Sequence, residues 1–257
     1  MPVVTNPDST EPASARERLI FALDVDTLDE AERLVKQLAD RVGVFKVGPR
    51  LFTRVGSLVF DLIHGLGSQV FLDLKFHDIP ASVGAAAKEA ARHRVKMFTI
   101  HALGGSTMIR EVANQLAKTT LVPGASPPIP LAVTLLTSHS PEDVRALGFE
   151  QPVPELVERL GQMAVRSGAG GIVCSGHEVR PLKAVLPPEC VFVVPGIRSP
   201  TDVAGDQSRI MTPAAAIAEG ATYIVVGRPI RDAEDPQAAA ERMVDGIAEG
   251  LEARGGS

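Results

Sequence analysis

Eight short apolar runs, separated by segments with helical periodicity, constrain the fold of this chain most strongly. The runs are nearly continuous in apolar residues instead of alternating with polar ones, which is typical of parallel strands covered on both faces. We interpret the following ranges as strands: 18–25, 44–48, 69–75, 97–102, 130–136, 171–176, 191–196 and 223–228. Strands that alternate with helices in this way predict an α/β protein, a single-domain (β/α)8 TIM barrel over residues 18–254.

The intervening segments support this prediction. Thr27 and Glu30 form the pattern of a capping box at the start of the first of them, and residues 48–67 resemble a less regular helix that ends at Gly65 or Gly67. The other segments with helical spacing are 80–94, 105–118, 152–168, 212–220 and 235–255. A doubly wound open sheet is the alternative fold. It would favour a glycine fingerprint after the first strand, where the sequence reads ALDVDTLDE without any glycine.

Composition excludes several classes of function. The formal net charge of the 257 residues is −5 and no segment is strongly basic, which argues against a nucleic-acid-binding protein. No stretch reaches the roughly 18 apolar residues that a membrane span requires. Residues 1–17 lack an apolar signal-peptide core and are expected to be a flexible polar N-terminal tail. Cys174 and Cys190 lie in valine-rich runs, as buried thiols do, so we expect a reduced, cytoplasmic protein.

Charged residues interrupt the third apolar run, FLDLKFHDIP at residues 71–80. Side chains alternate between the two faces of a strand, so Phe71, Asp73 and Lys75 should point into the barrel, while the intervening apolar residues point outward. Asp24 and Lys46 fall at the ends of the first two strands, at the same mouth of the barrel. A structural plug of ion pairs is one interpretation. A functional site is favoured, because carboxylates crowded around a lysine perturb pKa values.

A second group of residues predicts an anion site. Gly227 and Arg228 follow the eighth strand, where barrels of this kind commonly bind phosphate. Glycine allows the backbone to approach the anion, and an arginine can bind it through two hydrogen bonds. Arg198 and Gln207 lie on the preceding long loop, which could close over a ligand.

These motifs occur in the order found in a known family. From Leu19 to Ile230 the chain resembles the orotidine 5′-phosphate decarboxylase family, through ALDVD, FKVGP, FLDLKFHDIP, LAVTLLTS, PGIR, DQSRIMTPAAAIAEGA and VVGRPI. The resemblance implies decarboxylation of orotidine 5′-monophosphate to UMP, the last step of de novo pyrimidine biosynthesis. It also implies that no metal or other cofactor takes part.

The resemblance also implies roles for individual residues. Lys75 would be the proton donor, with Asp73, Asp78 and Lys46 as the other catalytic residues. Asp78 would reach into the site of a neighbouring subunit, which implies a homodimer with shared active sites. The implied substrate-binding residues are Asp24 and Lys46 at the ribose, Thr137 at the pyrimidine, Arg198, Gln207, Gly227 and Arg228 at the phosphate, and in addition Ile79 and Ser82. At Ser82 the family often has threonine, so the detail of that contact differs here.

Two rival functions use the same barrel. A metal-dependent sugar-phosphate decarboxylase would require a magnesium-binding carboxylate beside the Asp-x-Lys-x-x-Asp element. A non-catalytic barrel that binds a phosphorylated metabolite would have little reason to place Lys75 between two aspartates. The histidines show no H-E-x-x-H or other metal-binding spacing, so we expect no metal site. His101 is interpreted as a structural or supporting residue, and His77 as one that orders the charged loop.

Overall fold

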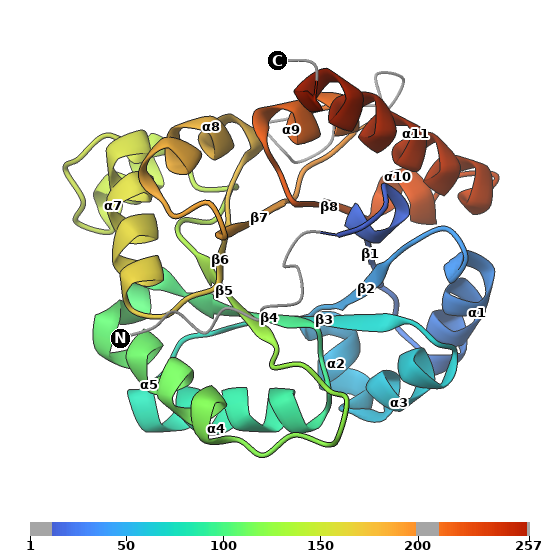
Figure 1. Ribbon diagram of the computed structural model, residues 1–257, viewed down its shortest axis with the longest axis horizontal. Coiled ribbons are helices and arrows are strands. Elements are labelled where there is room, and N and C mark those ends of the chain that lie inside the picture. Colours follow the sequence, from blue (N-terminus) through green and yellow to red (C-terminus); the bar gives the residue numbers. More distant parts are fainter. Residues whose placement is uncertain (1–11, 199–210, 256–257) are drawn as a thin grey trace.

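The computed structural model describes residues 12–198 and 211–255, and its strands close into one parallel barrel (Figure 1). The strands follow one another around the ring in chain order, and β1 pairs with both β2 and β8. Their bounds are β1 Leu19–Ala22, β2 Val44–Val47, β3 Gln69–Phe76, β4 Met97–His101, β5 Ile129–Val133, β6 Gly171–Val173, β7 Val191–Val194 and β8 Tyr223–Val226. The predicted single-domain barrel is therefore confirmed, and the open sheet is excluded.

Helices surround this ring of strands (Figure 1). Their bounds are α1 Leu28–Leu38, α2 Pro49–Val55, α3 Leu58–Gly65, α4 Pro80–Arg92, α5 Gly105–Lys118, α6 Pro141–Ala146, α7 Val153–Arg166, α8 Gly176–Val185, α9 Pro213–Glu219, α10 Arg228–Arg231 and α11 Pro236–Gly255, with 3-10 turns at Arg16–Arg18 and Ala102–Gly104. The predicted capping box of α1 is confirmed, because the Glu30 amide donates to Thr27 Oγ1 at 3.2 Å and the Thr27 amide donates to the Glu30 carboxylate at 3.2 Å.

The prediction of one helix over residues 48–67 was wrong. The segment forms two helices, α2 and α3, because the chain turns at Gly56, where φ is +60° and the amide bonds to the Phe52 carbonyl. Every predicted strand except 69–75 also ended later than the observed one, and in two of them a helix has already begun, α8 at Gly176 and α10 at Arg228. The sequence prediction missed α6 and α8, and α8 contains Pro181, a residue that normally interrupts a helix.

The core has two layers, separated by the strands. Residues that point into the barrel form the inner cluster: Ile20, Ala22, Val44, Phe71, Met97, Leu131, Val191, Val193, Tyr223 and Val225. Alternate strand residues, such as Phe21, Phe45 and Phe98, pack outward against the helices. Both cysteines are buried and free, as predicted, and burial is the main cause that raises the pKa of Cys190 to about 12.

The segment before β1 is only partly described. Arg18 is buried and donates to the carbonyl of Pro12 at 3.1 Å and to that of Thr222 at 3.4 Å, which ties residues 12–18 to the start of β8. Residues 1–11 lie outside the described residues, so a flexible tail over residues 1–17 stays a prediction. Among the helices of the described residues, none is long and apolar enough to cross a membrane.

Candidate active site

Four charged side chains meet at the carboxyl ends of β1, β2 and β3. The Nζ atom of Lys46 lies 3.6 Å from Asp24 Oδ1 and 3.3 Å from Asp73 Oδ2. On the other side of Asp73, Oδ1 lies 2.8 Å from Lys75 Nζ. The structure therefore brings Asp24, Lys46, Asp73 and Lys75 together as one chain of alternating charge, which we call the charged chain.

Asp73 is the buried centre of the charged chain. Only 8% of this residue is exposed, and its Oδ1 atom also accepts a hydrogen bond from Thr99 Oγ1 at 3.0 Å. Burial alone would raise the pKa of Asp73, but the charges of Lys46 and Lys75, with hydrogen bonds from Lys75 and Thr99, lower it below its usual value. Asp73 is therefore ionised at neutral pH and lies between two lysines.

Sequence reasoning missed Thr99, because a threonine within an apolar strand carries no signal of its contact partners. The pairing of β3 with β4 creates the contact. Between Leu72 and Phe76 the register shifts, so that β3 advances four residues while β4 advances two. This irregularity resembles a β-bulge, a feature often found beside active sites.

Lys75 lies in this irregular stretch with a left-handed backbone. Its φ is +51°, a conformation that costs an L-residue about 1–2 kcal/mol. The Lys75 amide donates to Thr99 Oγ1 at 2.8 Å, which holds the unusual conformation in place. Residues strained in this way cluster at functional sites, where the surrounding structure enforces them.

Two histidines lie beside Lys75. The rings of His77 and His101 have centroids 5.4 Å apart, and within residues 12–198 and 211–255 the buried Nδ1 atom of His101 has no hydrogen-bond partner. Burial, followed by the charges of His77 and Lys75, lowers the pKa of His101. His101 is therefore neutral at neutral pH and adds no positive charge beside Lys75.

The residues predicted to bind phosphate follow neighbouring strands. Gly227 precedes α10 directly after β8, and Arg228 is exposed at the start of that helix. Arg198 follows β7 and is buried, with its amide bonded to the Met211 carbonyl at 3.1 Å and its Nη1 to the Ile197 carbonyl at 3.0 Å. Gln207 lies outside the described residues.

The remaining predicted site residues do not bond to the charged chain within residues 12–198 and 211–255. The Asp78 carboxylate accepts a hydrogen bond from the amide of Ile79 at 2.6 Å, and Ile79 is 66% exposed. Ser82 is exposed in the first turn of α4, and Thr137 is half-buried in the loop after β5. Their roles at the site therefore stay predictions.

The arrangement suits a reaction that develops negative charge. An ammonium group at the mouth can stabilise a carbanion and then protonate it, and an ionised carboxylate holds that ammonium in place. No group of three histidine, cysteine, aspartate or glutamate side chains in the described residues is arranged to hold a metal ion. Each carboxylate of the charged chain instead lies beside a lysine.

Comparison with known proteins gives the family of the chain. Residues 17–243 match the model of the orotidine 5′-phosphate decarboxylase / HUMPS family. An orotidine 5′-phosphate decarboxylase of Syntrophotalea carbinolica is 47% identical over 238 residues, which cover 93% of this chain and 98% of that protein. One of Geobacter sulfurreducens is 44% identical and covers 92% and 98%.

A solved structure gives the same result. The crystal structure of orotidine 5′-phosphate decarboxylase from Lactobacillus acidophilus matches with a TM-score of 0.80 and 38% sequence identity. The match covers 89% of this chain and 98% of that one. The chain therefore belongs to the orotidine 5′-phosphate decarboxylase / HUMPS family.

Proposed function

We propose that this protein is a cytoplasmic orotidine 5′-phosphate decarboxylase, which converts orotidine 5′-monophosphate to UMP in the last step of de novo pyrimidine biosynthesis. The observation that carries the proposal is the charged chain from Asp24 to Lys75 at the barrel mouth, in a chain whose relatives bear that name. Alternating charges at this depth are costly to bury and are retained where they perform chemistry.

Lys75 performs the central step. The bond from C6 of the pyrimidine to its carboxylate breaks, CO2 leaves, and the electron pair stays on C6. The Lys75 ammonium stabilises this carbanion and then transfers a proton from Nζ to C6. Asp73, 2.8 Å away, accepts a hydrogen bond from Lys75 Nζ and lies near the departing carboxylate. The Nζ atom of Lys46 lies 3.3 Å from Oδ2, the second oxygen of Asp73, and forms an ion pair with it.

Repulsion between Asp73 and the substrate carboxylate is too small to account for catalysis alone. A single charge pair at 4 Å contributes roughly 4 kcal/mol at an effective dielectric constant of 20. Enzymes commonly lower the barrier by about 8–23 kcal/mol. Binding energy from the phosphate, spent on organising the charged chain, supplies much of the remainder.

The reaction requires neither a metal nor an organic cofactor. A divalent cation would need the carboxylates of Asp24 and Asp73, but Lys46 Nζ lies within 3.6 Å of both. A cation placed there would be repelled by that ammonium, since like charges at short range destabilise each other. This electrostatic conflict supports a mechanism that uses lysine in place of a metal.

The other predicted residues bind the substrate. Asp24 and Lys46 bind the ribose, and Thr137 contacts the pyrimidine, with Ile79 and Ser82 at the rim. The phosphate is bound by buried Arg198 together with Gln207, Gly227 and Arg228. Glycine lets the backbone approach the anion, and an arginine guanidinium can donate two parallel hydrogen bonds to it.

The active protein is a homodimer with shared sites. Asp78 forms no bond with Lys75 among the described residues, and its neighbour Ile79 is an exposed apolar side chain. Both observations support a role for Asp78 in the site of a partner subunit, with Ile79 covered by that subunit.

Measuring UMP formation from orotidine 5′-monophosphate, before and after exhaustive treatment with EDTA, tests the proposal. We expect equal turnover in both samples. Turnover that is lost on chelation and restored by magnesium would contradict the metal-independent mechanism and favour a metal-dependent decarboxylase. Tight binding of the nucleotide without any UMP would favour the non-catalytic barrel.

A further inference from the structure

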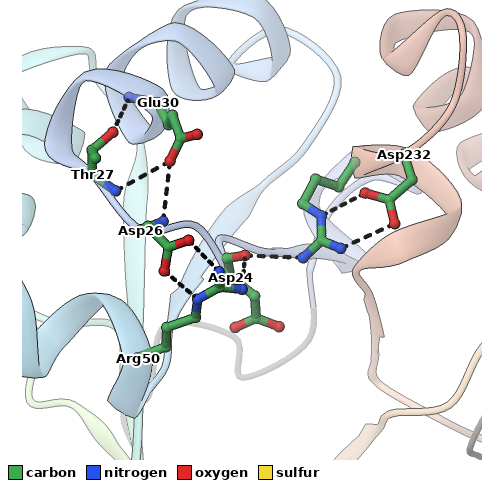
Figure 2. Close-up of polar contacts among 7 residues, drawn as sticks. Asp24, Asp26, Thr27, Glu30, Arg50 and Asp232 are labelled. Atoms are coloured by element: carbon green, nitrogen blue, oxygen red, sulfur yellow. Dashed lines mark hydrogen bonds and ion pairs between the residues drawn. The ribbon is translucent and has the colours of Figure 1, made fainter.

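Two arginines from separate elements converge on the backbone of Asp24 (Figure 2). Arg231, the last residue of α10, donates from Nη1 to the Asp24 carbonyl at 2.9 Å. Arg50, near the start of α2, donates from its own Nη1 to the same oxygen at 3.4 Å. The loop after β1 is thereby held from the side of β8 and from the side of β2.

An aspartate orients each of these arginines (Figure 2). Asp26 accepts from Arg50 Nε at 2.6 Å and also from its Nη2. Asp232 accepts from Arg231 Nε at 2.6 Å and from Nη2 at 3.0 Å. Because one edge of each planar guanidinium is bound to a carboxylate, the remaining Nη1 is aimed at Asp24.

The helix side of the loop is fixed as well. The Glu30 carboxylate accepts from the amides of Asp26 at 3.1 Å and Thr27 at 3.2 Å. The Asp24 side chain remains 43% exposed, with Oδ1 3.6 Å from Lys46 Nζ. The backbone of Asp24 is therefore clamped, while its carboxylate stays accessible at the barrel mouth.

We propose that Arg231 is a positioning residue, which holds Asp24 where its carboxylate binds the substrate, and that Arg50 supports it from the opposite side. The inference rests on the proposed function of Asp24 in substrate binding. Arg231 lies on the same short helix as Arg228, and this helix begins directly after Gly227. A single side chain thus joins the helix assigned to the phosphate to the residue assigned to the ribose.

A double-mutant cycle with Asp24 tests this role. We expect Arg231→Ala to lower kcat/KM about tenfold, mainly through KM, because a hydrogen bond from a charged donor is lost. In the Asp24→Ala background the same change should have no further effect. Arg231→Lys, which keeps a donor but not the fork to Asp232, should recover part of the loss. An equal loss in both backgrounds would mean a general structural role and would overturn the proposal.

Arg41→Ala is the matched control, since Arg41 is another surface arginine bound to a carboxylate, that of Glu241 at 2.8 Å. It should leave kcat/KM unchanged. Hydrogen exchange at the amides of Asp26 and Thr27 gives a readout that does not depend on turnover. These amides should exchange at least about tenfold faster in Arg231→Ala than in the control. Unchanged hydrogen exchange at these amides would mean that Arg231 does not hold the loop after β1, and it would overturn the proposal. If these amides exchange faster in Arg231→Ala but the wild type forms no UMP, only the proposed function is contradicted.

Discussion

Replacing Thr99 with valine should destabilise the protein at Asp73, the buried centre of the charged chain. Thr99 is fully buried, donates to Asp73 Oδ1 at 3.0 Å and accepts from the Lys75 amide at 2.8 Å. Valine has nearly the same shape but no hydroxyl. A hydrogen bond to a charged group contributes about 1.5–3 kcal/mol, and an unpaired buried amide costs about 1–3 kcal/mol. Because the strained Lys75 backbone can partly relax, we expect the free energy of unfolding to fall by about 2–4 kcal/mol.

Urea unfolding at neutral pH measures this loss, and Thr134→Val is its matched control. Thr134 is also fully buried, directly after β5, but within residues 12–198 and 211–255 its hydroxyl has no hydrogen-bond partner. The same substitution there should change the free energy of unfolding by less than about 0.5 kcal/mol, or increase it. Equal losses at both positions would refute the reasoning, since hydrogen bonding would then not distinguish the two threonines.

Three further predictions concern the charged motif. Lys75→Gly should be more stable than Lys75→Ala by about 1 kcal/mol in urea unfolding, because glycine accepts a φ of +51° without strain; equal stabilities would exclude the strain. Lys46 and Lys75 hold the pKa of Asp73 in the folded state below 3.8 despite its burial. The contribution of this carboxylate to the free energy of unfolding is therefore complete above pH 3.8 and is lost as the pH falls further. The free energy of unfolding should therefore fall more steeply below about pH 4 in wild type than in Asp73→Asn, and parallel curves would contradict this. Mixing inactive Lys75→Ala with inactive Asp78→Ala should restore activity at about a quarter of the sites once subunits exchange. Exchange of subunits without recovered activity would contradict the shared site.

The strands and the charged residues could be predicted because their signals are local. Parallel strands covered on both faces read as apolar runs, and Asp73 and Lys75 stand out in such a run as charges two residues apart. The alternation of side chains correctly placed Phe71 in the inner cluster and Leu72 in the outer one.

The supporting contacts could not be predicted, because they depend on how distant segments pair. Thr99 meets Asp73 only because β3 pairs with β4, and the register shift after Leu72 keeps the Lys75 amide beside Thr99 as well. Arg231 and Asp24 are 207 residues apart, and only closure of the barrel brings β8 beside β1. The break between α2 and α3 depends on a positive φ at Gly56, whereas glycine alone is compatible with either one helix or two.

The turnover of Lys75→Ala tests the central claim most directly. Lys36→Ala is the matched control, because Lys36 is an exposed lysine bound to Glu32 on α1, away from the charged chain. With UMP binding used to verify that both variants are folded, we predict that Lys36→Ala forms UMP at the wild-type rate. Loss of the proton donor and of its charge should lower the rate of Lys75→Ala by at least about 10²–10⁴-fold. A decrease of less than about tenfold, equivalent to roughly 1.4 kcal/mol, would contradict the role of Lys75 as the residue that stabilises and protonates the carbanion.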